Sequence, residues 1–141
     1  RSMVEAVVLP QLRNSSLRYR VVRGLPALSS LQSDEHVINF LDSETLQEEL
    51  AAAELIIARS GFSTVMDMQA LGGKAVFIPT PGQTEQEYLA KRLMEKGIAY
   101  YMKQDAFVLS SALAQSKNFS GFEPRKSTAL LRQAIANLLA S

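Results

Sequence analysis

The sequence has no cysteine and only one histidine, His36. The lack of cysteine excludes disulfide bonds and thiolate metal sites, and a single imidazole excludes a metal centre built from several histidines. No apolar run approaches the roughly 20 residues that a membrane-spanning helix needs. The formal net charge is only +1 and the basic residues are scattered, which argues against nucleic acid as the main partner. The absence of cysteine also suits a cytosolic location.

What the chain does have is a composition typical of one globular domain. It contains 141 residues, 47% of them apolar, which is enough for a core of ordinary size. Short apolar runs alternate with helical patterns along most of its length. Strands are expected at five places: Tyr19 to Arg23, His36 to Leu41, Leu55 to Ile57, Ala75 to Ile78 and Ile98 to Met102.

Helical patterns lie between and around these strands. The helices are expected over these ranges: Met3 to Leu9 (ending near Pro10), from the cap Asp42-Ser43 through Ala53, Thr64 to Leu71, Glu85 to Lys96, Asp105 to Gln115 and Arg125 to Ala140. The alternation predicts an α/β fold, a doubly wound, Rossmann-like parallel sheet with right-handed crossovers. Such sheets usually begin with a strand and a glycine-rich turn, and this sheet is expected to lack that first strand. The segment from 117 to 124 is expected to be a loop that exposes Phe119 and Phe122, and these two rings would either cover the core or face a missing domain.

The segment from Arg59 to Asp67 is the centre of the predicted site. It follows one buried strand and leads into a helix that Gly72-Gly73 ends, so it is the turn of a βαβ unit. Ligands of such units bind beyond the carboxyl ends of the strands. Gly61 would let the backbone approach a bound group, and the helix start offers free N–H groups to an anion.

Three polar loops follow predicted strands and should therefore lie on one edge of the sheet. They are Phe40 to Asp42, Arg59 to Thr64 and Thr80 to Gln86. Together they supply hydroxyl groups for phosphate, a carboxylate for ribose hydroxyls, and a Glu/Gln pair for a sugar; the residues are Ser60, Ser63, Thr64, Asp67, Glu85 and Gln86. Each also has a plainer interpretation, as a helix cap, a residue of a helix start or a solvated side chain. The set suits a nucleotide-sugar.

The region from Val37 to Tyr101 resembles the donor-binding, C-terminal half of the GT-B glycosyltransferases. It is similar to the type that moves N-acetylglucosamine from UDP onto a lipid-linked muramyl peptide of peptidoglycan. The resemblance is carried by Arg59-Ser60-Gly61-x-x-Thr64-Val65-x-Asp67, then by Ala75-Val76-Phe77-Ile78-Pro79, Glu85-Gln86 and Glu95-Lys96-Gly97.

The resemblance implies roles for particular residues. Asp67 stands where the family has a glutamate that binds both ribose hydroxyls, and Glu85 with Gln86 matches a pair that contacts the sugar and phosphates. Leu41 matches a residue whose backbone reads the uracil edge, beside Phe40. Ser60, Gly61 and Thr64 would face the diphosphate. Leu89 departs from the pattern, because the family usually has asparagine there.

The resemblance further implies that residues 1–141 form the donor domain of an inverting two-domain glycosyltransferase. The reaction would need no metal or other cofactor, and the catalytic base and acceptor site would belong to a missing N-terminal domain. The location would be cytoplasmic, with contact to the inner membrane face only through that missing half. Two alternatives remain: a UDP-sugar epimerase or hydrolase on the same scaffold, and a binding module without catalysis.

Overall fold

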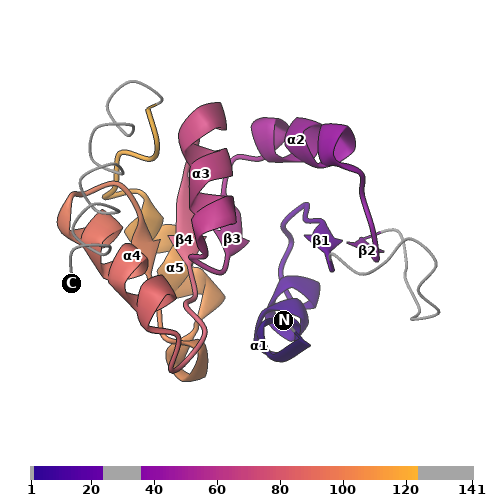
Figure 1. The fold of residues 1–141 in the computed structure, drawn as a ribbon. Coiled ribbons are helices and arrows are strands. Elements are labelled where there is room, and N and C mark those ends of the chain that lie inside the picture. Colours follow the sequence, from indigo (N-terminus) through magenta and orange to yellow (C-terminus); the bar gives the residue numbers. More distant parts are fainter. Residues whose placement is uncertain (1, 24–35, 124–141) are drawn as a thin grey trace.

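The structure, a computed structural model, describes residues 2–23 and 36–123 (Figure 1). The elements in chain order are α1 Ser2–Arg13, β1 Val21–Val22, β2 Val37–Ile38, α2 Ser43–Ala52, β3 Ile56–Ala58, α3 Phe62–Leu71, β4 Ala75–Phe77, α4 Thr84–Glu95, β5 Tyr100–Tyr101, the 3₁₀ turn η1 Gln104–Ala106 and α5 Leu109–Ser116. The five strands lie within the ranges expected from the sequence or within one residue of them. The expected helix over 125–140 lies outside the described residues.

All strand pairs in the described chain are parallel, which confirms the α/β class. The strands form two sheets rather than one continuous sheet. β1 pairs with β2, and β3, β4 and β5 form a second sheet in that order. Figure 1 shows the two sheets next to each other, with β1 and β3 as the neighbouring inner strands.

The central strand β4 is buried on both of its faces. Ala75 and Phe77 pack into a core with buried residues of α3 and α4, such as Val65 and Leu89. Val76 points the other way, into a second core with residues of α1 and α5. Helices therefore cover both faces of the larger sheet, as a doubly wound fold requires. A strand buried on both sides must be apolar throughout, and this explains the Ala-Val-Phe-Ile run.

The expectation that the first helix ends near Pro10 is wrong. α1 continues through Pro10 to Arg13, although an internal proline removes one backbone hydrogen bond and costs about 3 kcal/mol. Val8, Leu9 and Leu12 are buried on both sides of the proline. Their burial, at about 1.5–3 kcal/mol for each large apolar side chain, offsets that cost.

The expected helix over Asp105 to Gln115 is divided in two. η1 ends at Ala106, and α5 begins at Leu109 after Val108 in an extended conformation. Phe107, between them, is 4% exposed and packs into the core beneath α1. The Gln11 side chain fixes this break, since its amide donates to the Phe107 carbonyl at 3.1 Å and accepts from the Leu109 N–H at 2.6 Å.

The loop over 117–124 does not expose Phe119 and Phe122, and of the two alternatives for these rings the structure shows packing on the core for Phe122. Phe122 is 4% exposed and meets Phe77 edge to face, with ring centroids 6.3 Å apart. Its backbone exchanges hydrogen bonds with Gly73 at 2.7 and 3.2 Å, so the loop is anchored to the end of α3. Phe119 is half-buried, and its ring lies against that of Tyr100, with the ring centroids 5.6 Å apart.

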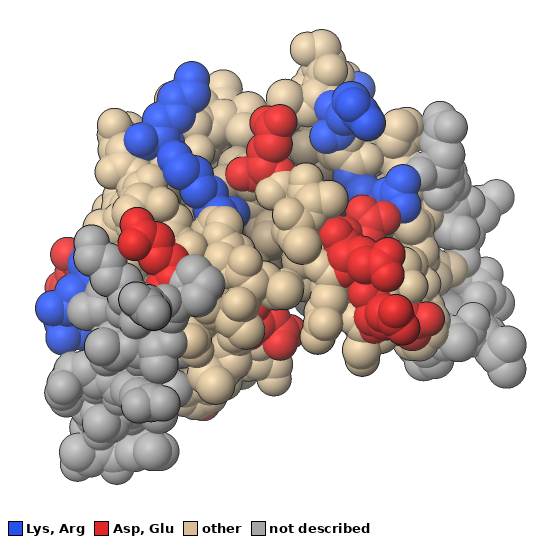
Figure 2. Space-filling model, turned by 90° about the horizontal axis from the view of Figure 1, so that it is seen from above, with Lys and Arg blue, Asp and Glu red and all other residues tan. Residues whose placement is uncertain are grey.

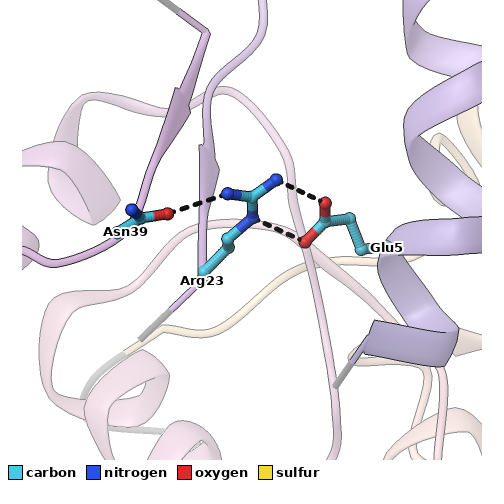
Figure 3. A network of polar contacts seen from close by, with 3 residues as sticks. All are labelled: Glu5, Arg23 and Asn39. Atoms are coloured by element: carbon cyan, nitrogen blue, oxygen red, sulfur yellow. Dashed lines mark hydrogen bonds and ion pairs between the residues drawn. The ribbon is translucent and has the colours of Figure 1, made fainter. Parts of the chain in front are cut away.

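A bidentate ion pair attaches α1 to the smaller sheet (Figure 3). Arg23, directly after β1, donates from Nε and Nη2 to the two carboxylate oxygens of Glu5, both at 2.9 Å. Its Nη1 donates to Asn39 Oδ1 at 2.8 Å, just beyond β2. Because both side chains are largely buried, at 16% and 23% exposure, the pair is less screened than a surface salt bridge.

Within residues 2–23 and 36–123, no helix is both long and apolar enough to cross a bilayer.

The buried position of Phe122 leads to a stability prediction. Phe122→Ala leaves a cavity beside Phe77 and should lower the free energy of unfolding by about 3–5 kcal/mol. The matched control is Phe40→Ala, because Phe40 is 45% exposed and should change stability by less than about 1 kcal/mol. Urea unfolding measures both. Equal losses in the two variants would contradict the packing described here.

Candidate functional site

The turn between β3 and α3 presents an uncapped helix start. Gly61 is the N-cap residue and no side chain caps the helix. The Gly61 carbonyl accepts the first helical bond, from Val65 N–H at 3.0 Å. The N–H groups of Phe62, Ser63 and Thr64 at this end have no partner within the helix, so they can bind an anion.

Gly61 leaves space in front of this helix start. Its φ is −74°, an ordinary value, so the backbone conformation itself does not require glycine. A Cβ at this position would contact no other atom within 4 Å. The space that the missing side chain leaves is therefore open to a ligand.

Ser60 is completely buried and links two loops of the site. Its hydroxyl donates to the Gln86 carbonyl at 2.7 Å. The Gln86 side-chain oxygen in turn accepts from the Thr80 N–H at 2.8 Å, which closes the loop after β4. Ser60 and Gln86, both predicted site residues, are thus brought together. Their bonds hold the β4–α4 loop against the β3–α3 turn.

Arg59 belongs to the sequence motif, but the sequence assigns it no role. In the structure it positions the loops around it. Its guanidinium donates to the Ile78 carbonyl at 3.1 Å and to Gln104 Oε1 at 2.6 Å, so it joins the ends of β3 and β4 to η1. Burial lowers the pKa of Arg59 from its usual value, but arginine stays protonated in proteins. The strand ends therefore carry a positive charge. The sequence does not single out Gln104 as a site residue, because its only signal is a polar residue shortly after the last strand.

The remaining polar candidates near this turn are accessible. Ser63, Asp67 and Glu85 are exposed, and Thr64 is half-buried. Ser63 and Asp67 are four residues apart on α3, so they lie on one face of the helix. Glu85 lies in the first turn of α4, next to Gln86. These side chains can reach a ligand without breaking a contact within the fold.

Phe40 and Leu41 follow β2, which belongs to the smaller sheet. The other two loops of the predicted site follow β3 and β4, which belong to the larger sheet. Phe40 is exposed and Leu41 half-buried. Asp42 beside them is occupied as the N-cap of α2, since it accepts from the Thr45 N–H at 2.8 Å. This bond holds the pKa of Asp42 below its usual value.

Leu89 has a structural role. It is 0% exposed and belongs to the core between β4 and α4. The apolar side chain there fills the interior of the domain.

Basic and acidic side chains are both present on the surface of the domain. Figure 2 shows separate groups of lysine and arginine side chains and of aspartate and glutamate side chains on the face seen from above. Within residues 2–23 and 36–123, no cluster of three or more histidine, cysteine, aspartate or glutamate side chains could hold a metal ion.

Comparison with known proteins gives a consistent family. Residues 20–137 match the model of the glycosyltransferase family 28 C-terminal domain. Among curated proteins, the chain is 38% identical over 86 residues to the UDP-N-acetylglucosamine–N-acetylmuramyl-(pentapeptide) pyrophosphoryl-undecaprenol N-acetylglucosamine transferase of Methylorubrum populi, and 33% identical over 96 residues to that of Acidiphilium cryptum. The matches cover 59% and 63% of this chain but only 23% and 26% of those relatives.

Two solved structures share the fold. The glycotransferase of kitacinnamycin superposes with a TM-score of 0.64 at 14% identity, over 94% of this chain and 35% of that one. MurG of Acinetobacter baumannii superposes with a TM-score of 0.58 at 23% identity, over 82% of this chain and 37% of that one.

The burial of Ser60 leads to a second prediction. Ser60→Ala leaves the Gln86 carbonyl without its buried donor and should lower the free energy of unfolding by about 1–3 kcal/mol. Ser63→Ala is the matched control, because that hydroxyl is exposed and its loss should cost less than about 0.5 kcal/mol. Urea unfolding of both variants provides the measurement. A larger loss for the Ser63 variant would contradict the role of Ser60 as a link between the loops.

Proposed function

The chain belongs to the family of glycosyltransferase family 28 C-terminal domains, and from this membership we propose that it binds the UDP-sugar donor of a hexosyl transfer reaction. The donor would be UDP-N-acetylglucosamine or a close analogue, as the names of the relatives suggest. The transfer would proceed with inversion at the sugar carbon.

One observation carries this proposal: the uncapped start of α3 behind the open space at Gly61. Three free N–H groups and the positive end of the helix dipole suit a diphosphate. The Arg59 guanidinium adds positive charge at the adjacent strand ends. A leaving UDP develops negative charge on its diphosphate, and fixed donors at this place would stabilise that charge without a metal ion.

The accessible side chains around the helix start would contact the rest of the donor. The Asp67 carboxylate, one turn along α3, would accept hydrogen bonds from the ribose hydroxyls. Ser63 and Thr64 would support the diphosphate. Because the side-chain oxygen of Gln86 is occupied by Thr80 N–H, its amide nitrogen is the group left for the sugar or phosphate, beside the Glu85 carboxylate.

Phe40 and Leu41 would hold the base. An exposed aromatic ring offers a surface for stacking, and the backbone of Leu41 would pair with the uracil edge. Both residues follow β2 in the smaller sheet, so the nucleotide would extend from the α3 start across to that sheet. Ser60, which is fully buried, would act by holding the Gln86 loop rather than by direct contact.

Transfer itself would need the rest of a longer protein. The chain matches only 23% of the length of the Methylorubrum relative, and we assign the catalytic base and the acceptor site to an N-terminal domain outside this sequence. The isolated chain would therefore bind a donor without turnover. The name of the relative includes an undecaprenol-linked group, a lipid, so membrane contact at the cytoplasmic face would also come from that other domain.

The proposal predicts a specific loss of UDP affinity. Isothermal titration of the chain with UDP at up to millimolar concentration should show binding, and Asp67→Ala should weaken it about 10- to 100-fold by removing charge-assisted hydrogen bonds. Glu95→Ala is the control, because this exposed carboxylate lies at the far end of α4 and its loss should leave affinity unchanged.

Two results would contradict the proposal. Absence of any heat with the unmodified chain would remove its main support, and equal weakening in both variants would show a non-specific charge effect. Incubation of the longer natural protein with UDP-N-acetylglucosamine and no acceptor provides a separate check. Release of free sugar or an epimer would favour a hydrolase or epimerase instead.

A further inference from the structure

The dipeptide Phe40-Leu41 after β2 is held in place from both of its ends. On one side, Asn39 Oδ1 accepts a hydrogen bond from Arg23 Nη1 at 2.8 Å. On the other side, the Asp42 carboxylate caps α2 by accepting from the Thr45 N–H at 2.8 Å. Both neighbours of the dipeptide are therefore fixed by contacts to other parts of the fold.

The side chain of Phe40 is not used by the fold itself. It is 45% exposed. Among the residues that the structure describes, no aromatic ring lies against that of Phe40, and Phe40 belongs to neither hydrophobic core. A ring on a fixed backbone that lacks such contacts offers its face to a flat ligand without a prior rearrangement.

Arg23 is itself fixed by two elements. Its backbone N–H donates to the Ile38 carbonyl at 2.9 Å, which extends the pairing of β1 with β2. Its guanidinium donates to both carboxylate oxygens of Glu5, and Figure 3 shows it between Glu5 and Asn39. A bidentate contact fixes the plane of the guanidinium. The remaining terminal nitrogen, Nη1, is thereby directed at Asn39.

Glu5 belongs to a helix that packs on both sheets. Val8 and Leu12 of α1 lie in the core that contains Val76 of β4, and Val21 of β1 packs against the same core. The chain of contacts from Asn39 through Arg23 to Glu5 therefore relates the end of β2 to the larger sheet. The start of α3 follows a strand of that larger sheet.

A fixed relation between the two sheets matters for a ligand that touches both. In the described chain, no strand of the smaller sheet pairs with a strand of the larger one. The nucleotide proposed above would place its diphosphate at the start of α3 and its base at Phe40 and Leu41. If these places were not fixed before binding, ordering them would reduce the affinity.

We propose that Arg23 is a positioning residue of the donor site, which holds Phe40 and Leu41 through Asn39 in the position that receives the nucleotide base. Arg23 does not touch the donor. It acts on the binding of the base and leaves the binding of the diphosphate unchanged. This role rests on the proposed function, since it requires a base at Phe40 and Leu41. A contact that only stabilised the fold would affect both parts of the ligand alike.

The test compares UDP with inorganic pyrophosphate, which lacks the base, by isothermal titration of the chain. Asn39→Ala removes the acceptor and leaves the pair of Glu5 with Arg23 intact. Asn39→Asp has the same shape and keeps an acceptor oxygen, so it is the conservative rescue. Asn118→Ala is the matched control, because this amide is exposed in the turn after α5.

Asn39→Ala should weaken UDP binding about 3- to 10-fold and change pyrophosphate binding less than about twofold. The aspartate variant and the Asn118 control should keep the affinity of the unmodified chain for UDP. In the free alanine variant, NMR order parameters of the Phe40 and Leu41 amides should fall. Arg23→Lys keeps the charge and loses the bidentate contact, so it should give the same selective loss, and it replaces the alanine variant if urea unfolding shows that variant to be unfolded.

Several results would overturn the role of Arg23 alone. They are unchanged UDP affinity or unchanged order parameters in the alanine variant, equal weakening of UDP and pyrophosphate, and an aspartate variant that behaves like the alanine variant. A different result bears on the proposed function. If the unmodified chain binds UDP no more tightly than pyrophosphate, the base does not bind at Phe40 and Leu41, and the role of Arg23 fails together with that assignment.

Discussion

The alternating hydrogen bonds of parallel strands are the constraint on which the rest of this structure depends. Each interior residue of such a strand bonds to one neighbour, so every strand has two edges that require partners. β4 has a partner strand at each of its two edges, β3 and β5, and it is buried throughout. The same parallel arrangement directs the carboxyl ends of the strands to one edge of each sheet. It therefore determines where the candidate site lies.

The polar residues of the site fall into two groups with different physical roles. Arg59, Ser60 and the Gln86 oxygen are bonded within the fold and hold the β3–α3 turn, the β4–α4 loop and η1 together. Ser63, Asp67 and Glu85 are exposed and available to a ligand. A rigid arrangement of the first group is what allows the second group to bind a ligand without first being ordered.

Local patterns predicted the features that local forces determine. The short apolar runs gave the strands, Gly72 ended α3, and the motif around Arg59 to Asp67 gave the family, which the comparisons confirmed. Long-range packing determined the rest. Pro10 stays inside α1 because its neighbours are buried, Phe107 breaks a helix because it enters the core, and Phe122 is buried through its contact with Phe77. The link from Ser60 to Gln86 spans 26 residues, and no local pattern contains it.

We propose that the open start of α3 is the anion-binding part of a nucleotide-sugar site. Mapping backbone amide chemical shifts of the isotope-labelled chain during titration with UDP tests this most directly. Donor binding at this place should give saturable shifts concentrated at Gly61, Ser63, Thr64 and Gln86, with little change in the last turn of α4. Shifts that spread over the exposed surface, or that leave the amides of the α3 start unaffected at saturation, would contradict it.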